Sequence, residues 1–158
     1  WRLWMKFLII NGPNLNLMHF TEPGVAGQID YNALLDYLDV CCQQMGIEPD
    51  FFQSNHEGDI IDEIQSAAGR ADGIIINPGG YAYYSVAILE ALQLCGVPAV
   101  EVMLHAPDGR EPFRQTDIVS FGCQGHFIGE GPQGYLHACL YLAQLLRADG
   151  TGKAHIVM

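Results

Sequence analysis

Three kinds of side chain in this sequence could bind or transform a small acid. Asn77 opens a turn, residues 77–80, whose proline and two glycines expose backbone N–H groups suited to a carboxylate or a hydroxyl-rich ligand. Arg110 and Arg114 are four residues apart, so on a helical turn they share a face and could hold an anion. His105 ends an apolar run and could act as a general acid or base.

Each of these residues also has a structural interpretation, which the sequence leaves open. Asn77 could only cap its own turn, and the arginines could form surface ion pairs with Asp108 or Glu111. A single histidine such as His105 is more often structural than catalytic. Other chemistries lack their signatures: there is no glycine-rich nucleotide loop, no nucleophile elbow, and no Cys-x-x-Cys or i, i+4 histidine pair. A nucleotide or metal site is therefore not expected.

Composition narrows the classes of partner. Hydrophobic residues make up 49% of the 158 residues and charged ones 16%, which favours a full core that other copies of the chain could partly cover. Eighteen acidic and seven basic residues give a formal charge of −11, so neither nucleic acid nor an anionic membrane is expected as a partner. Five cysteines in apolar stretches predict reduced thiols and a cytoplasmic location. No apolar run approaches the ~18 residues of a membrane span.

Apolar runs that end in polar turns predict where the candidate residues meet. Three such runs, at residues 6–14, 49–58 and 73–81, each lead into a turn that contains asparagine. We expect five strands, at about residues 6–11, 49–53, 73–76, 99–104 and 126–129. Because ligands bind outside the carboxyl ends of parallel strands, the three turns should converge on one crevice.

The fourth predicted strand sends side chains to two faces. Period-2 alternation places Glu101, Met103 and His105 on one face, and Val102 and Leu104 on the other. His105 then lies at the end of the strand beside the crevice, which favours an acid or base role.

Four amphipathic segments predict helices between the strands. Asp30 can cap the first, and Ser54 with Glu57 has the form of a capping box before the second. The third spans about residues 85–95 and the fourth about 133–147. The polar loop at residues 14–28 is longer than most strand-to-helix links, so we expect it to be a lid over the site.

Alternating strands and helices predict an α/β fold. The expected form is a flavodoxin-like three-layer sandwich with a five-stranded parallel sheet in the order 2-1-3-4-5. Residues 5–150 form the single predicted domain. We expect residues 1–4 to be an appended or upstream segment and residues 151–158 to be a C-terminal tail.

Taken together, these motifs resemble the type II 3-dehydroquinate dehydratases. The matching segments are FLIINGPNLNL at 7–17, FFQSNHEGDIID at 51–62, INPGGYAYYSVAI at 76–88, VPAVEV at 97–102, REPFR at 110–114 and GEGPQGYLHAC at 129–139. The resemblance implies a flavodoxin-like subunit, a homododecamer or homotrimer, and an enzyme without cofactor or metal. The family removes water from 3-dehydroquinate, a small anionic substrate, through an enolate.

The resemblance also implies roles for individual residues. Asn14 fills the position of the asparagine that holds a water near the enolate oxygen, and Glu101 fills that of the carboxylate that steadies the catalytic histidine. The substrate-binding residues that we expect are Asn77, Tyr81, Glu90, Leu104 and His105, and Arg114.

The proton-transfer positions depart from the pattern of the family. Its lid has the form R-E-P-x-x-Y-G, and here Thr21 stands for the arginine and Ala26 for the basic tyrosine. Met103 stands for the acid histidine, Tyr83 for a binding histidine and His105 for a serine. Threonine, alanine and methionine transfer no proton at neutral pH, and acid and base steps are each worth about 10²–10⁴ in rate.

The leading hypothesis is therefore a dehydroquinase-fold enzyme repurposed for another small organic acid or carbonyl compound. The reaction would be a lyase, isomerase or cyclisation step through an enolate-like intermediate. His105 would be the main acid or base, Tyr83 a second proton donor, Asn14 the polariser, and Asn77 and Arg114 the anchors.

Two alternatives remain open from the sequence. The first is the 3-dehydroquinate dehydratase of the shikimate pathway, with His105 and a lid residue such as His19 or Glu22 as substituted acid and base. The second is a non-catalytic ligand-binding or scaffolding relative.

Overall fold

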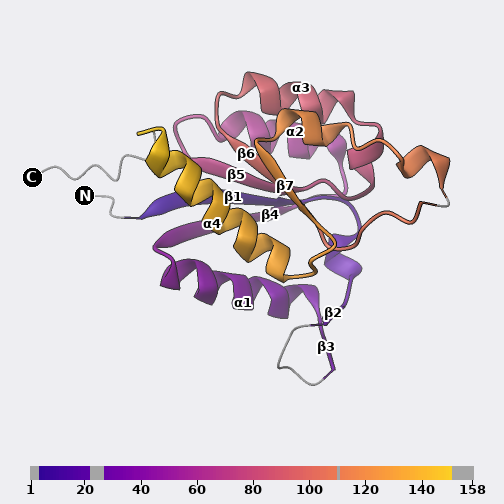
Figure 1. Ribbon diagram of the computed structural model, residues 1–158, viewed down its shortest axis with the longest axis horizontal. Coiled ribbons are helices and arrows are strands. Elements are labelled where there is room, and N and C mark those ends of the chain that lie inside the picture. The colour runs from indigo at the N-terminus through magenta and orange to yellow at the C-terminus, as the bar shows by residue number, and fades with distance from the viewer. Residues whose placement is uncertain (1–3, 22–26, 110, 151–158) are drawn as a thin grey trace, which may run out of the picture.

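A computed structural model describes residues 4–21, 27–109 and 111–150, and its centre is a parallel sheet between two helical layers (Figure 1). The strands are β1 (Met5–Asn11), β4 (Ile47–Gln53), β5 (Gly73–Asn77), β6 (Ala99–Met103) and β7 (Gly125–Ile128). They pair in parallel in the order β4-β1-β5-β6-β7. This arrangement confirms the predicted α/β fold and the strand order 2-1-3-4-5.

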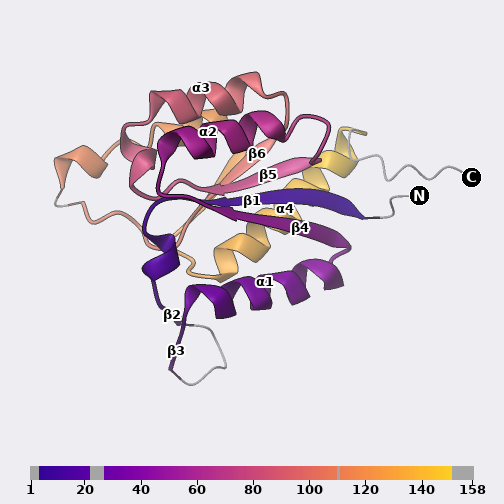
Figure 2. The ribbon, with the colours of Figure 1, turned by 180° about the vertical axis from the view of Figure 1, so that it is seen from behind.

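Two pairs of helices cover the two faces of the sheet. Figures 1 and 2 show α1 (Tyr31–Gln44) and α4 (Gln133–Ala148) on one face, and α2 (Glu57–Ser66) and α3 (Val86–Leu94) on the other. The side chains of β1 alternate accordingly: Phe7 and Ile9 join the core under α1 and α4, and Leu8 and Ile10 join the core under α2 and α3. All four are fully buried, as expected for a central strand covered on both faces.

Of the two predicted N-terminal helix caps, the structure confirms one. Asp30 caps α1, since its Oδ1 accepts the N–H of Ala33 at 2.8 Å. The capping box at Ser54 is wrong, because α2 begins at Glu57 with His56 as its N-cap residue. The Ser54 hydroxyl instead accepts the N–H of His56 at 2.9 Å and donates to Asp59.

The predicted lid contains a small element of its own. Two short strands, β2 (Phe20–Thr21) and β3 (Gln28–Ile29), pair antiparallel. The connection between them, with Glu22 and Ala26, lies outside the described residues, as do most of the predicted end segments 1–4 and 151–158. Within the part of the chain that is described, no helix is long and apolar enough to cross a membrane.

Candidate active site

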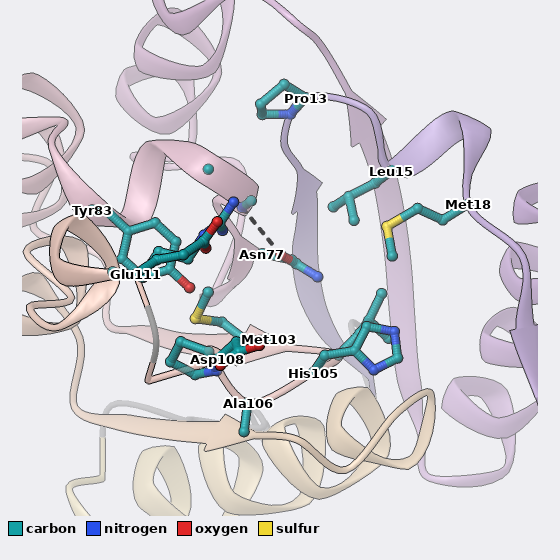
Figure 3. A pocket seen from close by; sticks show the side chains of 15 residues that line it. Pro13, Leu15, Met18, Asn77, Tyr83, Met103, His105, Ala106, Asp108 and Glu111 are labelled. Carbon is teal, nitrogen blue, oxygen red and sulfur yellow. Dashed lines mark hydrogen bonds and ion pairs between the residues drawn. The ribbon is translucent and has the colours of Figure 1, made fainter.

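A cavity of about 300 Å³ lies at the carboxyl ends of β1, β5 and β6 (Figure 3). The apolar residues of its wall include Pro13, Leu15, Met18 and Met103. The polar and charged groups that line it are Asn77, Tyr83, His105, Asp108, Glu111 and Arg114. The turns after β1 and β5 therefore meet at one crevice, as the sequence predicts.

The third predicted turn, after β4, does not line this cavity but supports the other two. The Asn55 side chain accepts the N–H of Asn14 at 3.0 Å, and the Asn55 carbonyl accepts the hydroxyl of Tyr81 at 2.7 Å. Asn14 has a left-handed backbone with φ of 67°. Neither Asn14 nor Tyr81 lines the cavity.

The ends of β1 and β5 are held together closely at Gly12. Its N–H donates to the carbonyl of Asn77 at 2.8 Å. A Cβ at this position would lie 2.5 Å from the carbonyl oxygen of Pro78, so any side chain would separate the two turns. This contact explains the glycine and fixes Asn77 against the first turn.

Asn77 is buried in the floor of the cavity and serves its turn as well as the site. Its Oδ1 accepts the N–H of Gly79 at 3.2 Å, and its Nδ2 donates to the hydroxyl of Tyr135 at 3.1 Å. The structural interpretation is thus confirmed, and one N–H of the amide remains for a ligand.

Arg114 is held in a cluster of aromatic and acidic groups at the mouth of the cavity. It ends the 3-10 turn η3 (Pro112–Arg114), forms an ion pair with Glu111, and places its guanidinium carbon 5.2 Å from the ring centre of Tyr83. A hydrogen bond with Tyr83 and the Glu111 carboxylate raise the pKa of Arg114. The expected pair with Glu111 is therefore present, whereas Arg110 lies outside the described residues.

Two groups able to transfer protons stand on opposite sides of Asn77. Figure 3 shows Tyr83 on one side and His105 on the other. Tyr83 comes from the 3-10 turn η2 (Gly79–Tyr83), and exposed His105 follows β6 by two residues. Both line the cavity, so a ligand on Asn77 would lie between them.

Glu101 lies beneath the site and does not line the cavity. It is fully buried in β6, and both of its carboxylate oxygens lack a hydrogen-bond partner, as does the buried Oδ2 of Asp117. Burial first, and then the charge of Asp117, raise the pKa of Glu101 to about 9. A protonated Glu101 supplies the missing donor between the two acids, so we take Glu101 as a neutral carboxylic acid at pH 7.

The remaining predicted residues have mixed positions. Leu104 lines the cavity and packs in the core under α1 and α4 with Val102, as the alternation predicts. Glu90 is exposed on α3 and does not line the cavity. Asp117 and Tyr135 were not predicted, because neither ends a strand and the resemblance gave neither a role. In the described ranges, no three His, Cys, Asp or Glu side chains are grouped so that they could hold a metal ion.

Comparisons with known proteins define the class. Residues 5–143 match the model of the family Dehydroquinase class II. The 3-dehydroquinate dehydratase of Caldicellulosiruptor bescii is 41% identical over 142 residues, which cover 89% of this chain and 98% of that protein. The 3-dehydroquinate dehydratase of Campylobacter hominis is 40% identical over 141 residues, with 89% of this chain and 91% of that protein covered.

Solved structures agree with the sequence relatives. The type II dehydroquinase of Butyrivibrio crossotus matches with a TM-score of 0.80 and 40% identity, covering 88% of this chain and 97% of that one. The fold and the site thus define a member of a lyase family. The chain belongs to the class II dehydroquinases.

Proposed function

We propose that this protein dehydrates 3-dehydroquinate or a closely related ring acid, with Tyr83 and His105 as the proton-transfer groups. The observation that supports this most is the contact between Tyr83 and Arg114 in the cavity wall. By resemblance, the family pairs a basic tyrosine with an arginine on its lid, and the lid positions here hold Thr21 and Ala26. Tyr83 and Arg114 would supply the same two chemical groups from the turns after β5 and β6.

The proposed reaction is an elimination of water. Tyr83, as a phenolate paired with the Arg114 cation, takes the proton from the carbon next to the ketone. The enolate so formed expels the hydroxyl of the next carbon, which leaves as water after His105 donates a proton to it. A carbon–carbon double bond forms in conjugation with the ketone. Asn77 and Arg114 would hold the carboxylate and the ring oxygens.

The direct test is incubation of the purified protein with 3-dehydroquinate while the ultraviolet absorbance of the conjugated enone is followed. We expect turnover by the native protein and a loss of at least about 10²-fold in His105→Gln. The matched control is His126→Gln, which changes an exposed histidine on β7 outside the cavity. Absence of enone with the native protein rejects the proposal.

A second candidate is a repurposed enzyme for a flatter or more hydrophobic acid. Met103 supports it, because this apolar side chain lines the cavity, as do those of Leu15 and Met18. Under this proposal the aromatic acid 3,4-dihydroxybenzoate binds more tightly than quinate, the saturated tetrahydroxy acid. Tighter binding of quinate would reject it.

We also propose that the chain forms a homo-oligomer in the cytoplasm, as the resemblance implies. The side chains that support this are large, apolar and more than half exposed: Tyr84, Val86, Leu94, Phe113 and Phe121. Apolar exposure on this scale is typical of an interface. Light scattering should give a trimer or a dodecamer, and a monomer at micromolar concentration would reject the assembly.

A further inference from the structure

A chain of hydrogen bonds runs from the floor of the cavity to the start of α1. The Nδ2 of Asn77 donates to the Tyr135 hydroxyl at 3.1 Å, and this hydroxyl donates to Asn11 Oδ1 at 2.5 Å. The Nδ2 of Asn11 in turn donates to the Tyr31 hydroxyl at 3.1 Å. Asn11, Asn77 and Tyr135 are each at most 2% exposed, so water does not compete with these bonds.

The direction of every bond in this chain follows from one fixed donor. The backbone N–H of Gly79 can only donate, so its partner on Asn77 must be Oδ1. The amide nitrogen of Asn77 then faces Tyr135, whose single proton must go to Asn11. All three side-chain bonds therefore donate in the same sense, from Asn77 towards Tyr31.

This order leaves one polar group of Asn77 for a ligand, and it is a donor. The oxygen is bonded to Gly79, and one of the two N–H groups is bonded to Tyr135. Figure 3 shows Asn77 at the centre of the cavity, with its nitrogen end turned away from the dashed hydrogen bond that its oxygen accepts. A reversed amide would present an oxygen and repel a carboxylate.

We propose that Tyr135 and Asn11 are positioning residues that hold the free N–H of Asn77 towards the ligand, so that the floor selects an oxygen acceptor. Tyr31 ends the chain and supports Asn11. The proposal deepens the proposed function, since a carboxylate or a ketone of a ring acid is such an acceptor. It does not depend on turnover, because the orientation of Asn77 is a property of the free protein.

The test uses the full chain labelled with ¹⁵N, in which the side-chain amide of Asn77 is assigned by its loss in Asn77→Ala. Tyr135→Phe removes only the hydroxyl. We expect the Asn77 amide signal to shift and its proton exchange to become about tenfold faster. Tyr141→Phe is the matched control, because it removes a hydroxyl from the same helix that donates to the Gln124 carbonyl at 3.0 Å, outside the hydrogen-bond chain from Asn77. The control should leave the Asn77 signal unchanged.

Binding of quinate, followed by chemical shift, is the second readout. Tyr135→Phe should bind quinate about tenfold more weakly than the native protein, and Tyr141→Phe should bind it with native affinity. An Asn77 signal that is the same in Tyr135→Phe as in the native protein overturns the proposal. If the native protein does not bind quinate, the proposed function loses its support, while the amide signal still decides the positioning role.

A second variant keeps the test decisive if Tyr135→Phe does not fold. Tyr31→Phe removes the acceptor at the partly exposed end of the chain. We expect the side-chain amide of Asn11 to lose protection and that of Asn77 to shift in the same direction as in Tyr135→Phe. If the side-chain amide signals of both residues are unchanged, the proposed hydrogen-bond chain is contradicted.

Discussion

The guanidinium carbon of Arg114 lies 5.2 Å from the centre of the Tyr83 ring, and the same cation forms an ion pair with Glu111. An arginine at this distance interacts with the face of the ring and can also bond to the phenolic oxygen. Tyr83 is thereby the one phenol in the described cavity wall with a cation beside it.

Tyr83→Phe keeps the stacked ring and removes the oxygen. If Tyr83 is the base, kcat for 3-dehydroquinate should fall by about 10²–10⁴ while quinate binding changes little, because the ring still supports Arg114. Tyr84→Phe is the control, since that side chain is exposed and outside the cavity. Equal activity of Tyr83→Phe and the native protein would remove Tyr83 from the mechanism.

Met103→His should raise dehydratase activity. Met103 lines the cavity and follows Glu101 by two residues in the same strand, so an imidazole there would have the buried Glu101 acid as a neighbour on the same face of the strand. We expect kcat for 3-dehydroquinate to increase at least tenfold, because a second general acid enters the cavity. The same change at Met18, which lines the cavity from the segment after β1 rather than from β6, should give no increase. Equal gains in both variants would show that Glu101 is irrelevant.

Glu101→Gln should change how stability depends on pH. The folded pKa of Glu101 is raised to about 9 from an ordinary value of 4.5, so its contribution to stability is complete below about pH 4.5 and is lost as the pH rises towards 9. The native protein should lose roughly 2–4 kcal/mol from this group between pH 5 and pH 8. The amide of the variant stays neutral and can still donate to Asp117.

Denaturant unfolding at pH 5 and at pH 8 measures this effect. The variant should be about as stable as the native protein at pH 5 and more stable at pH 8. Glu48→Gln, which alters an exposed carboxylate 3.8 Å from Lys6, should show no such gain. If the stability of Glu101→Gln relative to the native protein instead decreases as the pH rises, Glu101 is ionised in the folded protein.

Gly12→Ala should damage the site through the backbone. The added Cβ would lie 2.5 Å from the Pro78 oxygen and 2.7 Å from its carbonyl carbon, so the turns after β1 and β5 must separate. We expect a loss of about 2–4 kcal/mol in unfolding free energy and weaker quinate binding. Gly58→Ala, in α2 with no atom within 4 Å of the added Cβ, should be neutral or stabilising. A stable variant with native quinate affinity would contradict the close contact.

The sheet could be predicted from sequence because its signals are local. Apolar runs predicted all five main strands, three of them with an asparagine turn at the end, although β4 begins at Ile47, two residues before the predicted start. That strand includes Pro49, which is tolerated because β4 lies at the edge of the sheet. The Ser54 cap was mispredicted because two nearby groups, the N–H of His56 and the carboxylate of Asp59, compete for the same hydroxyl.

The site could be predicted where its residues end a strand or share a short spacing. Asn77 ends β5, His105 follows β6 by two residues, and Arg114 was predicted from its spacing to Arg110; all three line the cavity. Tyr135 bonds to Asn11 across 124 positions, and no local pattern announces a contact over that separation. Asp117 lies near Glu101 but belongs to an irregular segment. Its effect on the pKa of Glu101 could therefore be seen only in the structure.

The most direct test of the dehydratase proposal is proton NMR of 3-dehydroquinate with the protein in D₂O. We predict that the signal of the protons on the carbon next to the ketone is lost. A new vinyl proton signal from the conjugated product should appear at the same time. Line broadening of the bound acid with neither change would mean binding without chemistry, and it would contradict the assignment of Tyr83 and His105 as base and acid.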